Sequence, residues 1–215
     1  MSDMNLSDDS PLSELSKHSP ISGDGAKVYQ AIEDEAIVNT ALVLFLNALT
    51  LHCEDSLGQW TLRRHPFIVR SANTNEKIYE VRVDGLLRLN KSQHPAAIME
   101  VKSFLRYGDD GSSGPIRMQE SAQMAAWIAE NPPPSKSNSQ KHRRLLVSQD
   151  RHEIYLNIAT FSDDYVDYIR VENLKINDNA FLTMQEYGPF TVDKVHRMNQ
   201  VAKILLGVSI QGGLK

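Results

Sequence analysis

The apolar positions of three segments recur at the spacing of amphipathic helices. The first, 26–51, has a broad apolar face, and its acids lie in its first half, where the helix dipole favours them. The second runs over 116–129. The third, 191–206, begins at Thr191 and is followed by Gly207, and both are residue types that cap helices. The pattern therefore predicts three long helices.

Five other segments are rich in strand-forming residues or alternate between apolar and polar side chains. They are 60–69, 78–89, 96–104, 144–148 and 153–161. In the last of them, Ile154, Leu156 and Ile158 are expected to share one face. A segment at 163–168 is typical of a short helix or a turn. This order predicts an α/β or α+β fold, with a central mixed β-sheet flanked by helices.

Composition divides the chain into two parts. The first 25 residues are rich in Ser, Asp, Pro and Gly, lack apolar periodicity, and are predicted to form a disordered tail. Residues 26–215 are predicted to form one domain, long enough to bury a substantial core. No apolar run approaches the roughly 20 residues of a membrane span, and no signal-peptide pattern opens the chain. We therefore expect an intracellular protein, in the nucleus or cytoplasm, that does not bind membranes.

The net charge argues against a simple nucleic-acid coat protein. The formal charge is −4, and residues 1–25 account for all of it, because 26–215 carry 22 acids and 22 bases. Contacts to nucleic acid must then come from local basic patches, and the alternative for each patch is a solvated surface charge. The candidates are Arg63, Arg64, Arg106, Arg117, Arg143 and Arg144.

Three charged residues lie within or at the end of apolar runs. Asp84 interrupts 78–89, while Glu100 and Lys102 are two positions apart in 96–104, so both side chains leave one face of a strand. If the two strands pair, Asp84 joins them. Two neighbouring carboxylates repel unless a cation lies between them, and hard oxygen ligands favour Mg²⁺ or Mn²⁺. The alternative is an exposed strand on which Glu and Lys are solvated partners.

An Asp followed 16 positions later by Glu-x-Lys resembles the catalytic core of the PD-(D/E)XK nuclease superfamily. Gln123 and Trp127 look like the Gln-xxx-Tyr element of some nuclease branches, with Trp in place of Tyr, although a helix with one core aromatic and a polar residue at its edge has the same pattern. The phrases at 118–127, 147–151 and 186–190 look most like the nuclease-like domains that filamentous fungi encode.

The resemblance implies a restriction-endonuclease-like core with the acidic residues at one end of the sheet. It implies that Asp84 and Glu100, with the carbonyl of Val101, hold Mg²⁺ or Mn²⁺, and that Glu35 completes the metal shell through water. A solvated acid at a helix N-terminus is the alternative for Glu35. Lys102 would orient the attacking water or stabilise developing charge.

The glutamines Gln119 and Gln123 would position water or phosphate, since an amide both donates and accepts hydrogen bonds. The expected activity is metal-dependent hydrolysis of phosphodiester bonds, with nucleic acid, most of all DNA, as the partner. The alternative is a catalytically inactive nuclease-like module that binds nucleic acid or a protein.

Overall fold

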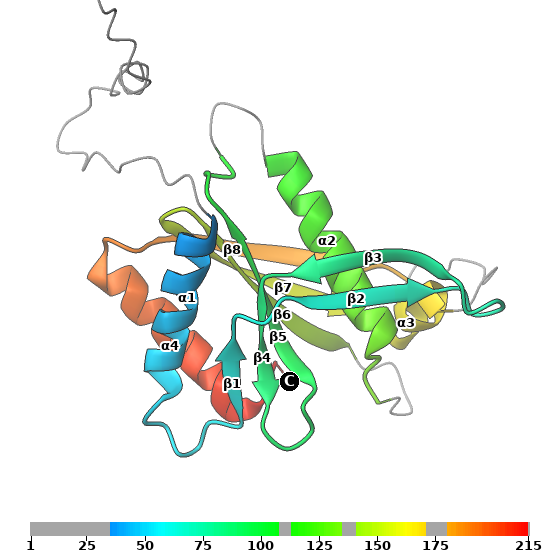
Figure 1. Ribbon diagram of the computed structural model, residues 1–215, viewed down its shortest axis with the longest axis horizontal. Coiled ribbons are helices and arrows are strands. Elements are labelled where there is room, and N and C mark those ends of the chain that lie inside the picture. Colours follow the sequence, from blue (N-terminus) through cyan, green and yellow to red (C-terminus); the bar gives the residue numbers. More distant parts are fainter. Residues whose placement is uncertain (1–34, 108–112, 135–140, 171–179, 215) are drawn as a thin grey trace, which may run out of the picture. The chain divides into compact units, whose positions relative to one another are not determined.

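The computed structural model describes residues 35–107, 113–134, 141–170 and 180–214 (Figure 1). The tail predicted for residues 1–25, and the first nine residues of the helix predicted over 26–51, lie outside this range. All described residues belong to one compact unit, Ile32–Lys215. No helix among them is long and apolar enough to cross a membrane.

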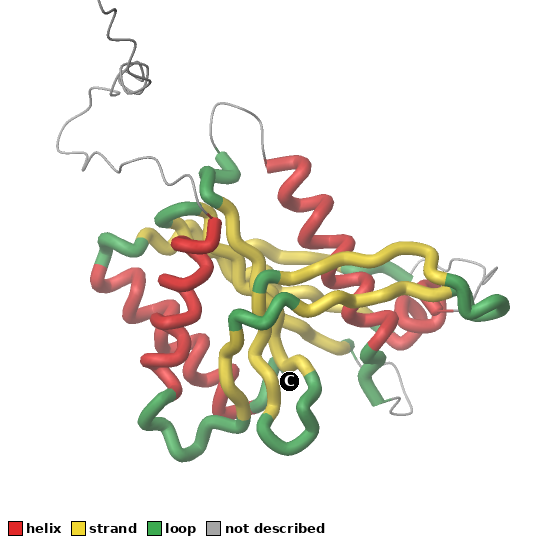
Figure 2. The backbone as a smooth tube through the Cα atoms, in the orientation of Figure 1, coloured by secondary structure: helices red, strands yellow, loops and turns green. Residues whose placement is uncertain are grey.

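Four helices and eight strands make up the described chain, and the main sheet has six strands in the order β1-β4-β5-β6-β7-β8. The helices are α1 (Glu35–Thr50), α2 (Ser113–Glu130), α3 (Asp163–Arg170) and α4 (Val195–Gln211). The strands are β1 (Gly58–Thr61), β2 (His65–Arg70), β3 (Lys77–Val83), β4 (Gly85–Leu89), β5 (Pro95–Lys102), β6 (His142–Asp150), β7 (Glu153–Phe161) and β8 (Thr183–Thr191). Within the main sheet β5 and β6 run parallel and the other neighbours antiparallel, which confirms the mixed α+β fold (Figure 2).

Helices cover both faces of the main sheet. One core cluster joins α1 and α4 to one face, with Leu156 of β7 and Met99 of β5 among its members. A second cluster joins α2 and α3 to the other face, where the neighbouring strand positions Ile98 and Ala159 point. Ile154, Leu156 and Ile158 belong to the first cluster, so the face predicted for them is confirmed.

Two of the predicted strands are each divided in the structure. The segment 60–69 contains the end of β1 and most of β2, and 78–89 contains β3 and β4, which belong to different sheets. The strands β2 and β3 pair with each other as a separate two-stranded sheet. Predicting one strand across each segment was wrong because both halves are apolar, and side-chain pattern alone does not reveal where the backbone changes partner.

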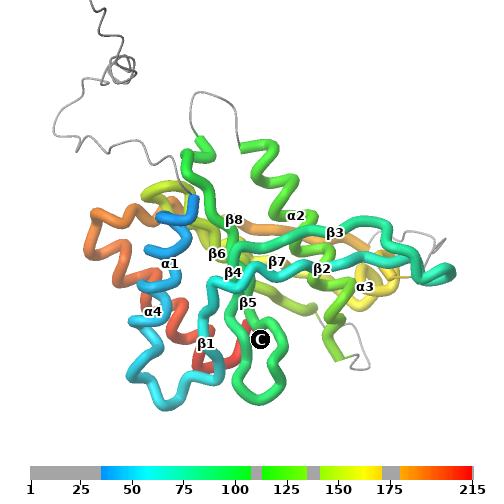
Figure 3. The backbone as a smooth tube through the Cα atoms, in the orientation of Figure 1, coloured from blue at the N-terminus to red at the C-terminus, as the bar shows by residue number. Residues whose placement is uncertain are grey.

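The strands β3 and β4 follow each other along the chain (Figure 3), and the one residue between them is Asp84. Its own N–H donates to the carbonyl of Met99 at 3.0 Å. The N–H of Val101 donates to Oδ2 of Asp84 at 3.0 Å, so a carboxylate takes the place of a strand carbonyl. Next to it, Gly85 is required because a Cβ there would lie 2.4 Å from the carbonyl oxygen of Thr61. The close backbone approach at Gly85 is thus made to β1.

The last strand and the last helix differ from the sequence prediction. Thr191 ends β8 and does not open a helix; α4 begins four residues later and ends before Gly212, whose φ of 68° and N–H bond to the Val208 carbonyl form the C-cap. Gly207 lies inside α4. Strand β8 was missed because it contains Gly188 and Pro189, residues that usually interrupt strands. Its position at the sheet edge, with a register shift opposite β7, accommodates them.

Candidate active site

Asp84, Glu100 and Lys102 meet at one end of the main sheet. Because β4 and β5 are antiparallel, the start of β4 and the end of β5 lie at the same end. The Lys102 ammonium donates to Oε1 of Glu100 at 2.6 Å, and the two side chains are only 13% and 4% exposed. The alternative of a solvated Glu–Lys pair on an exposed strand is therefore wrong.

The carboxylate of Asp84 has one protein donor on each oxygen. Oδ2 accepts a hydrogen bond from the backbone N–H of Val101, and Oδ1 lies 3.3 Å from Nε of Arg64. The Arg64 side chain is largely exposed, whereas that of Asp84 is largely buried. The negative charge of Asp84 also contributes to raising the pKa of Glu100, so the two carboxylates lie within electrostatic reach of each other.

Helix α2 supplies two amides to Glu100. Gln119 donates to Oε1 at 2.5 Å, and Gln123 donates to Oε2 at 2.6 Å and to the Arg82 carbonyl at 2.8 Å. Both glutamines, predicted to position water or phosphate, therefore lie at the acidic centre and donate to Glu100. Trp127 is a core residue, as the plainer interpretation of that helix had it, and its ring stacks on Phe67 with centroids 6.3 Å apart.

Burial raises the pKa of Glu100 to about 6, and the charge of Lys102 only partly opposes this effect. For Lys102, burial lowers the pKa, but the charges of Glu100, Glu35 and Asp84 outweigh it, so the net shift is upward. Lys102 is therefore a cation at neutral pH and is suited to stabilising negative charge, whereas it cannot serve as a general base.

The raised pKa of Glu100 predicts a pH dependence of stability. Between an unfolded pKa near 4.5 and a folded pKa of about 6, the folded state binds more protons, so the free energy of unfolding falls as pH rises through this window. The 1.5-unit difference corresponds to about 2 kcal/mol. Urea unfolding in chelator should therefore show Glu100→Gln gaining about 2 kcal/mol relative to wild type between pH 4 and pH 7. A constant difference across this range would contradict the assignment.

The residues around Glu100 suit a hard cation in their chemistry. Oε1 of Gln123 and Oδ1 of Asn39 are buried oxygens with no hydrogen-bond partner among the described residues. Asn39 lies beside Asp84, because its Nδ2 donates to the Asp84 carbonyl at 3.3 Å. The described residues contain no group of three or more His, Cys, Asp or Glu placed to hold a metal ion. Two carboxylates are nevertheless sufficient for Mg²⁺, which usually keeps several waters.

Glu35 and Val101 have different relations to this centre. Glu35 begins α1 and is near enough to Lys102 to raise its pKa. The N–H of Val101 donates to the Asp84 carboxylate. The Val101 side chain is buried in the core on the face of the sheet that α1 covers. Both residues predicted to complete the metal shell therefore lie at this end of the sheet.

Four of the six predicted nucleic-acid contacts are at the surface. Arg63, Arg64 and Arg143 are exposed, and Arg117 is 56% exposed although it lies 3.5 Å from Glu186. Arg64 is the one that reaches the acidic centre, through Asp84.

Arg106 and Arg144 do not lie at the open surface, where the predicted contacts to nucleic acid would need them. Arg106 is fully buried among carboxylates. Arg144 lies over the Trp127 ring, 4.3 Å from its centroid, where burial lowers its pKa to about 10. Sequence alone could not separate these two from the exposed arginines, because basic residues beside a polar segment usually face solvent.

The surroundings of Arg106 form an ionic network beside the acidic centre. Its guanidinium donates to Asp150 at 2.5 Å, to Glu120 at 2.8 Å and to Glu186 at 2.6 Å, and it lies over the ring of Tyr155. These acids come from β6, α2 and β8, so one side chain joins three elements. The network was not predicted. A polar residue, Asn157, within the apolar run 153–161 could have indicated buried polar partners, because its Nδ2 donates to Glu120 at 3.3 Å.

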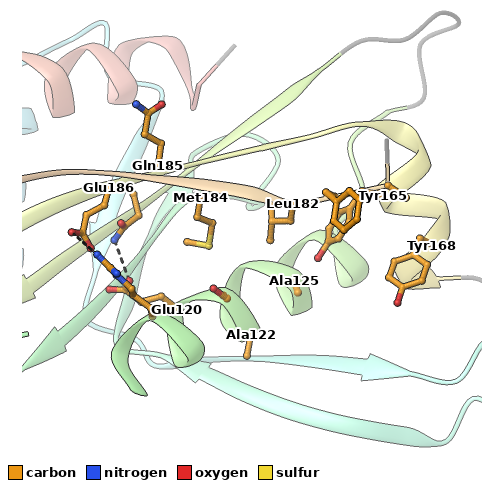
Figure 4. Close-up of a pocket in the computed structure, with 14 residues that line it drawn as sticks. Glu120, Ala122, Ala125, Tyr165, Tyr168, Leu182, Met184, Gln185 and Glu186 are labelled. Atoms are coloured by element: carbon orange, nitrogen blue, oxygen red, sulfur yellow. Dashed lines mark hydrogen bonds and ion pairs between the residues drawn. The ribbon is translucent and has the colours of Figure 1, made fainter. Parts of the chain in front are cut away.

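A pocket of about 960 Å³ lies between α2, α3 and β8 (Figure 4). Glu120 and Glu186 of the ionic network form its polar end, while Met184 lines it from β8 and Leu182 from just before that strand. Tyr165 and Tyr168 close the other end from α3. Asp84, Glu100 and Lys102 are not among its lining residues, so the pocket is separate from the acidic centre.

No protein-family model, no curated protein and no solved structure gives a significant match to this chain.

Proposed function

We propose that the protein is a Mg²⁺- or Mn²⁺-dependent nuclease that hydrolyses phosphodiester bonds, with DNA as its main substrate. The observation that supports this proposal most strongly is the buried Glu100, which accepts hydrogen bonds from Lys102, Gln119 and Gln123 next to Asp84. Burying a carboxylate is costly, and a site assembled from two acids and one lysine at a strand end needs a reason beyond stability.

Each residue has a role that follows from its contacts. Asp84 and Glu100, with the carbonyl of Val101 and Glu35 through water, would hold the metal ion. When bound, the ion would lower the pKa of a water molecule and offset charge on the phosphate. Lys102 keeps its proton at Nζ and presents a positive charge to the phosphate oxygens as negative charge develops.

The glutamines fix the orientation of Glu100. Gln123 bridges Glu100 and the Arg82 carbonyl, so it links α2, β5 and β3. The unpartnered Oε1 of Gln123 is free to accept a hydrogen bond from water. Gln119 lies one helical turn earlier and shares Oε1 of Glu100 with Lys102.

The proposal includes a restriction-endonuclease-like core and membership of the PD-(D/E)XK superfamily, close to its fungal nuclease-like domains. It is supported by the mixed sheet, by the helices on both faces, and by the position of Asp84 and Glu100 at one sheet end.

One observation favours the alternative of an inactive binding module. Both carboxylate oxygens of Glu100 already accept hydrogen bonds from the protein, so a metal ion must compete with Lys102 and the two glutamines. An inactive module would keep this arrangement permanently and would have no affinity for divalent ions.

Calorimetric titration with Mn²⁺ separates the two functions. We expect wild-type protein to bind the ion, and Asp84→Asn to bind it at least roughly tenfold more weakly, because one of two anionic ligands is lost. Glu54→Gln, which removes an exposed acid after α1, is the matched control and should bind like wild type. A silent titration of folded wild-type protein would support the inactive module.

A further inference from the structure

The hairpin formed by β2, β3 and their connecting turn carries a local positive charge together with the three residues that lead into it. Residues 62–83 hold the bases Arg63, Arg64, Arg70, Lys77 and Arg82. They hold only two acids, Glu76 and Glu80, which gives a net charge of +3, with Arg63 and Arg64 lying just before β2. Because residues 26–215 as a whole are neutral, the segment 62–83 is a positive region balanced by negative charge elsewhere.

The two faces of the hairpin differ in character. Its inner face, with Phe67 and Val69, packs against α2, and Glu130 of α2 accepts from the N–H of Ile68 at 2.7 Å. The register pairs Pro66 with Arg82, so their side chains lie on the opposite, outer face. The inner face anchors the hairpin to the main fold, and none of the helices and strands that the structure describes lies over the outer face (Figure 1).

The exposed arginines at this end of the hairpin lie close to the acidic centre. Nε of Arg64 is 3.3 Å from Oδ1 of Asp84, and Arg82 precedes Asp84 by two residues in the chain. Arg64 and Arg82 are 66% and 70% exposed. A chain of phosphates lying along the hairpin would therefore meet two arginines immediately before it meets Asp84.

The present partners of these arginines are weak competitors for phosphate. Arg82 pairs with Glu80 at 3.0 Å near solvent, and Arg64, itself 66% exposed, pairs with the largely buried Asp84. Exposed ion pairs contribute about 0–1 kcal/mol, whereas Arg binds phosphate through two parallel hydrogen bonds. Exchange of a carboxylate partner for a phosphate is therefore inexpensive.

We propose that the outer face of the β2–β3 hairpin, together with Arg64 just before β2, is a DNA-binding surface, on which Arg64 and Arg82 contact the phosphates next to the scissile bond. This inference rests on the proposed nuclease function and names how that site holds its substrate. The contacts are to the backbone, so they position the strand and do not read its sequence.

Salt-dependent binding of a labelled 20-base-pair duplex, measured by fluorescence anisotropy in chelator, tests this surface. Each lost phosphate contact should reduce the magnitude of the slope of log K against log salt by about 0.9. We expect a reduction of about 0.9 for Arg82→Gln and about 1.8 for Arg64→Gln/Arg82→Gln. Lys203→Gln removes one positive charge from an exposed position on α4 and is the matched control, with a wild-type slope.

The outcomes separate this inference from the nuclease function. Wild-type slopes in both arginine variants, or no duplex binding by wild-type protein, would overturn the DNA-binding surface even if wild-type protein cleaves DNA. Reduced slopes would support the surface even if no cleavage occurs, because the binding is measured without metal. Equal losses in Lys203→Gln would show a general charge effect and would also overturn it.

Discussion

Replacing Lys102 with alanine is expected to lower the rate of phosphodiester cleavage by roughly 10²-fold or more. The ammonium of Lys102 is held 2.6 Å from Oε1 of Glu100. In the proposed mechanism the phosphate binds beside this pair, and Lys102 offsets the negative charge that develops on the phosphate. The loss should fall mainly on kcat, because the interaction strengthens in the transition state. Steady-state cleavage of a fluorogenic duplex at saturating Mn²⁺ measures it.

Three comparisons sharpen this test. Lys102→Arg should restore little activity, because a planar guanidinium cannot occupy the position of a compact ammonium between Glu100 and the phosphate. Lys203→Ala, on exposed α4, should cleave at the wild-type rate. Mn²⁺ binding by Lys102→Ala should persist, since Asp84 and Glu100 remain. Cleavage by Lys102→Ala close to that of wild type would refute the role assigned to this residue.

Replacing Arg106 with methionine is expected to destabilise the fold by about 3–5 kcal/mol, because three carboxylates would lose their shared buried cation. Burial already raises the pKa of Glu120 and of Asp150, so their charged forms depend on Arg106. For a domain of this size the loss corresponds to a fall in Tm of about 6–20 °C. Urea unfolding at pH 7 measures the difference directly.

Two variants serve as controls for Arg106. Arg117→Gln breaks one exposed contact with the same acid, Glu186, and should change stability by no more than about 1 kcal/mol. Arg106→Met combined with Glu120→Gln and Asp150→Asn should recover part of the loss, since buried neutral amides repel each other less than carboxylates. Unchanged unfolding of Arg106→Met would show that the network is energetically neutral.

The fold class and the acidic centre could be predicted because both depend on local pattern. Alternation in 153–161 fixed which residues face each helix layer, and two-residue spacing placed Glu100 and Lys102 on one face. Gln119 and Gln123 were predicted to position water or phosphate; because they lie one helical turn apart, both amides reach Glu100 in the structure.

The errors arose where structure depends on contacts between distant residues. Arg106 lies 44 positions from Asp150 and 80 from Glu186 along the chain, so no local pattern indicates its burial. The change of sheet at Asp84 depends on the Val101 N–H, 17 positions away. Strand β8 is stabilised by pairing with β7 despite its Gly188 and Pro189, a case in which tertiary pairing overrides local propensity.

Cleavage of nucleic acid by purified protein is the most direct test of the proposed function. Supercoiled plasmid, linear duplex, single-stranded DNA and RNA are each incubated with wild type and Glu100→Gln, in Mg²⁺, Mn²⁺ or chelator. We predict that wild type cleaves DNA with either metal and not with chelator, and that Glu100→Gln purified in parallel is inactive. Intact substrates in every condition with folded wild-type protein, or equal cleavage by Glu100→Gln, would contradict a metal-dependent nuclease centred on Asp84, Glu100 and Lys102.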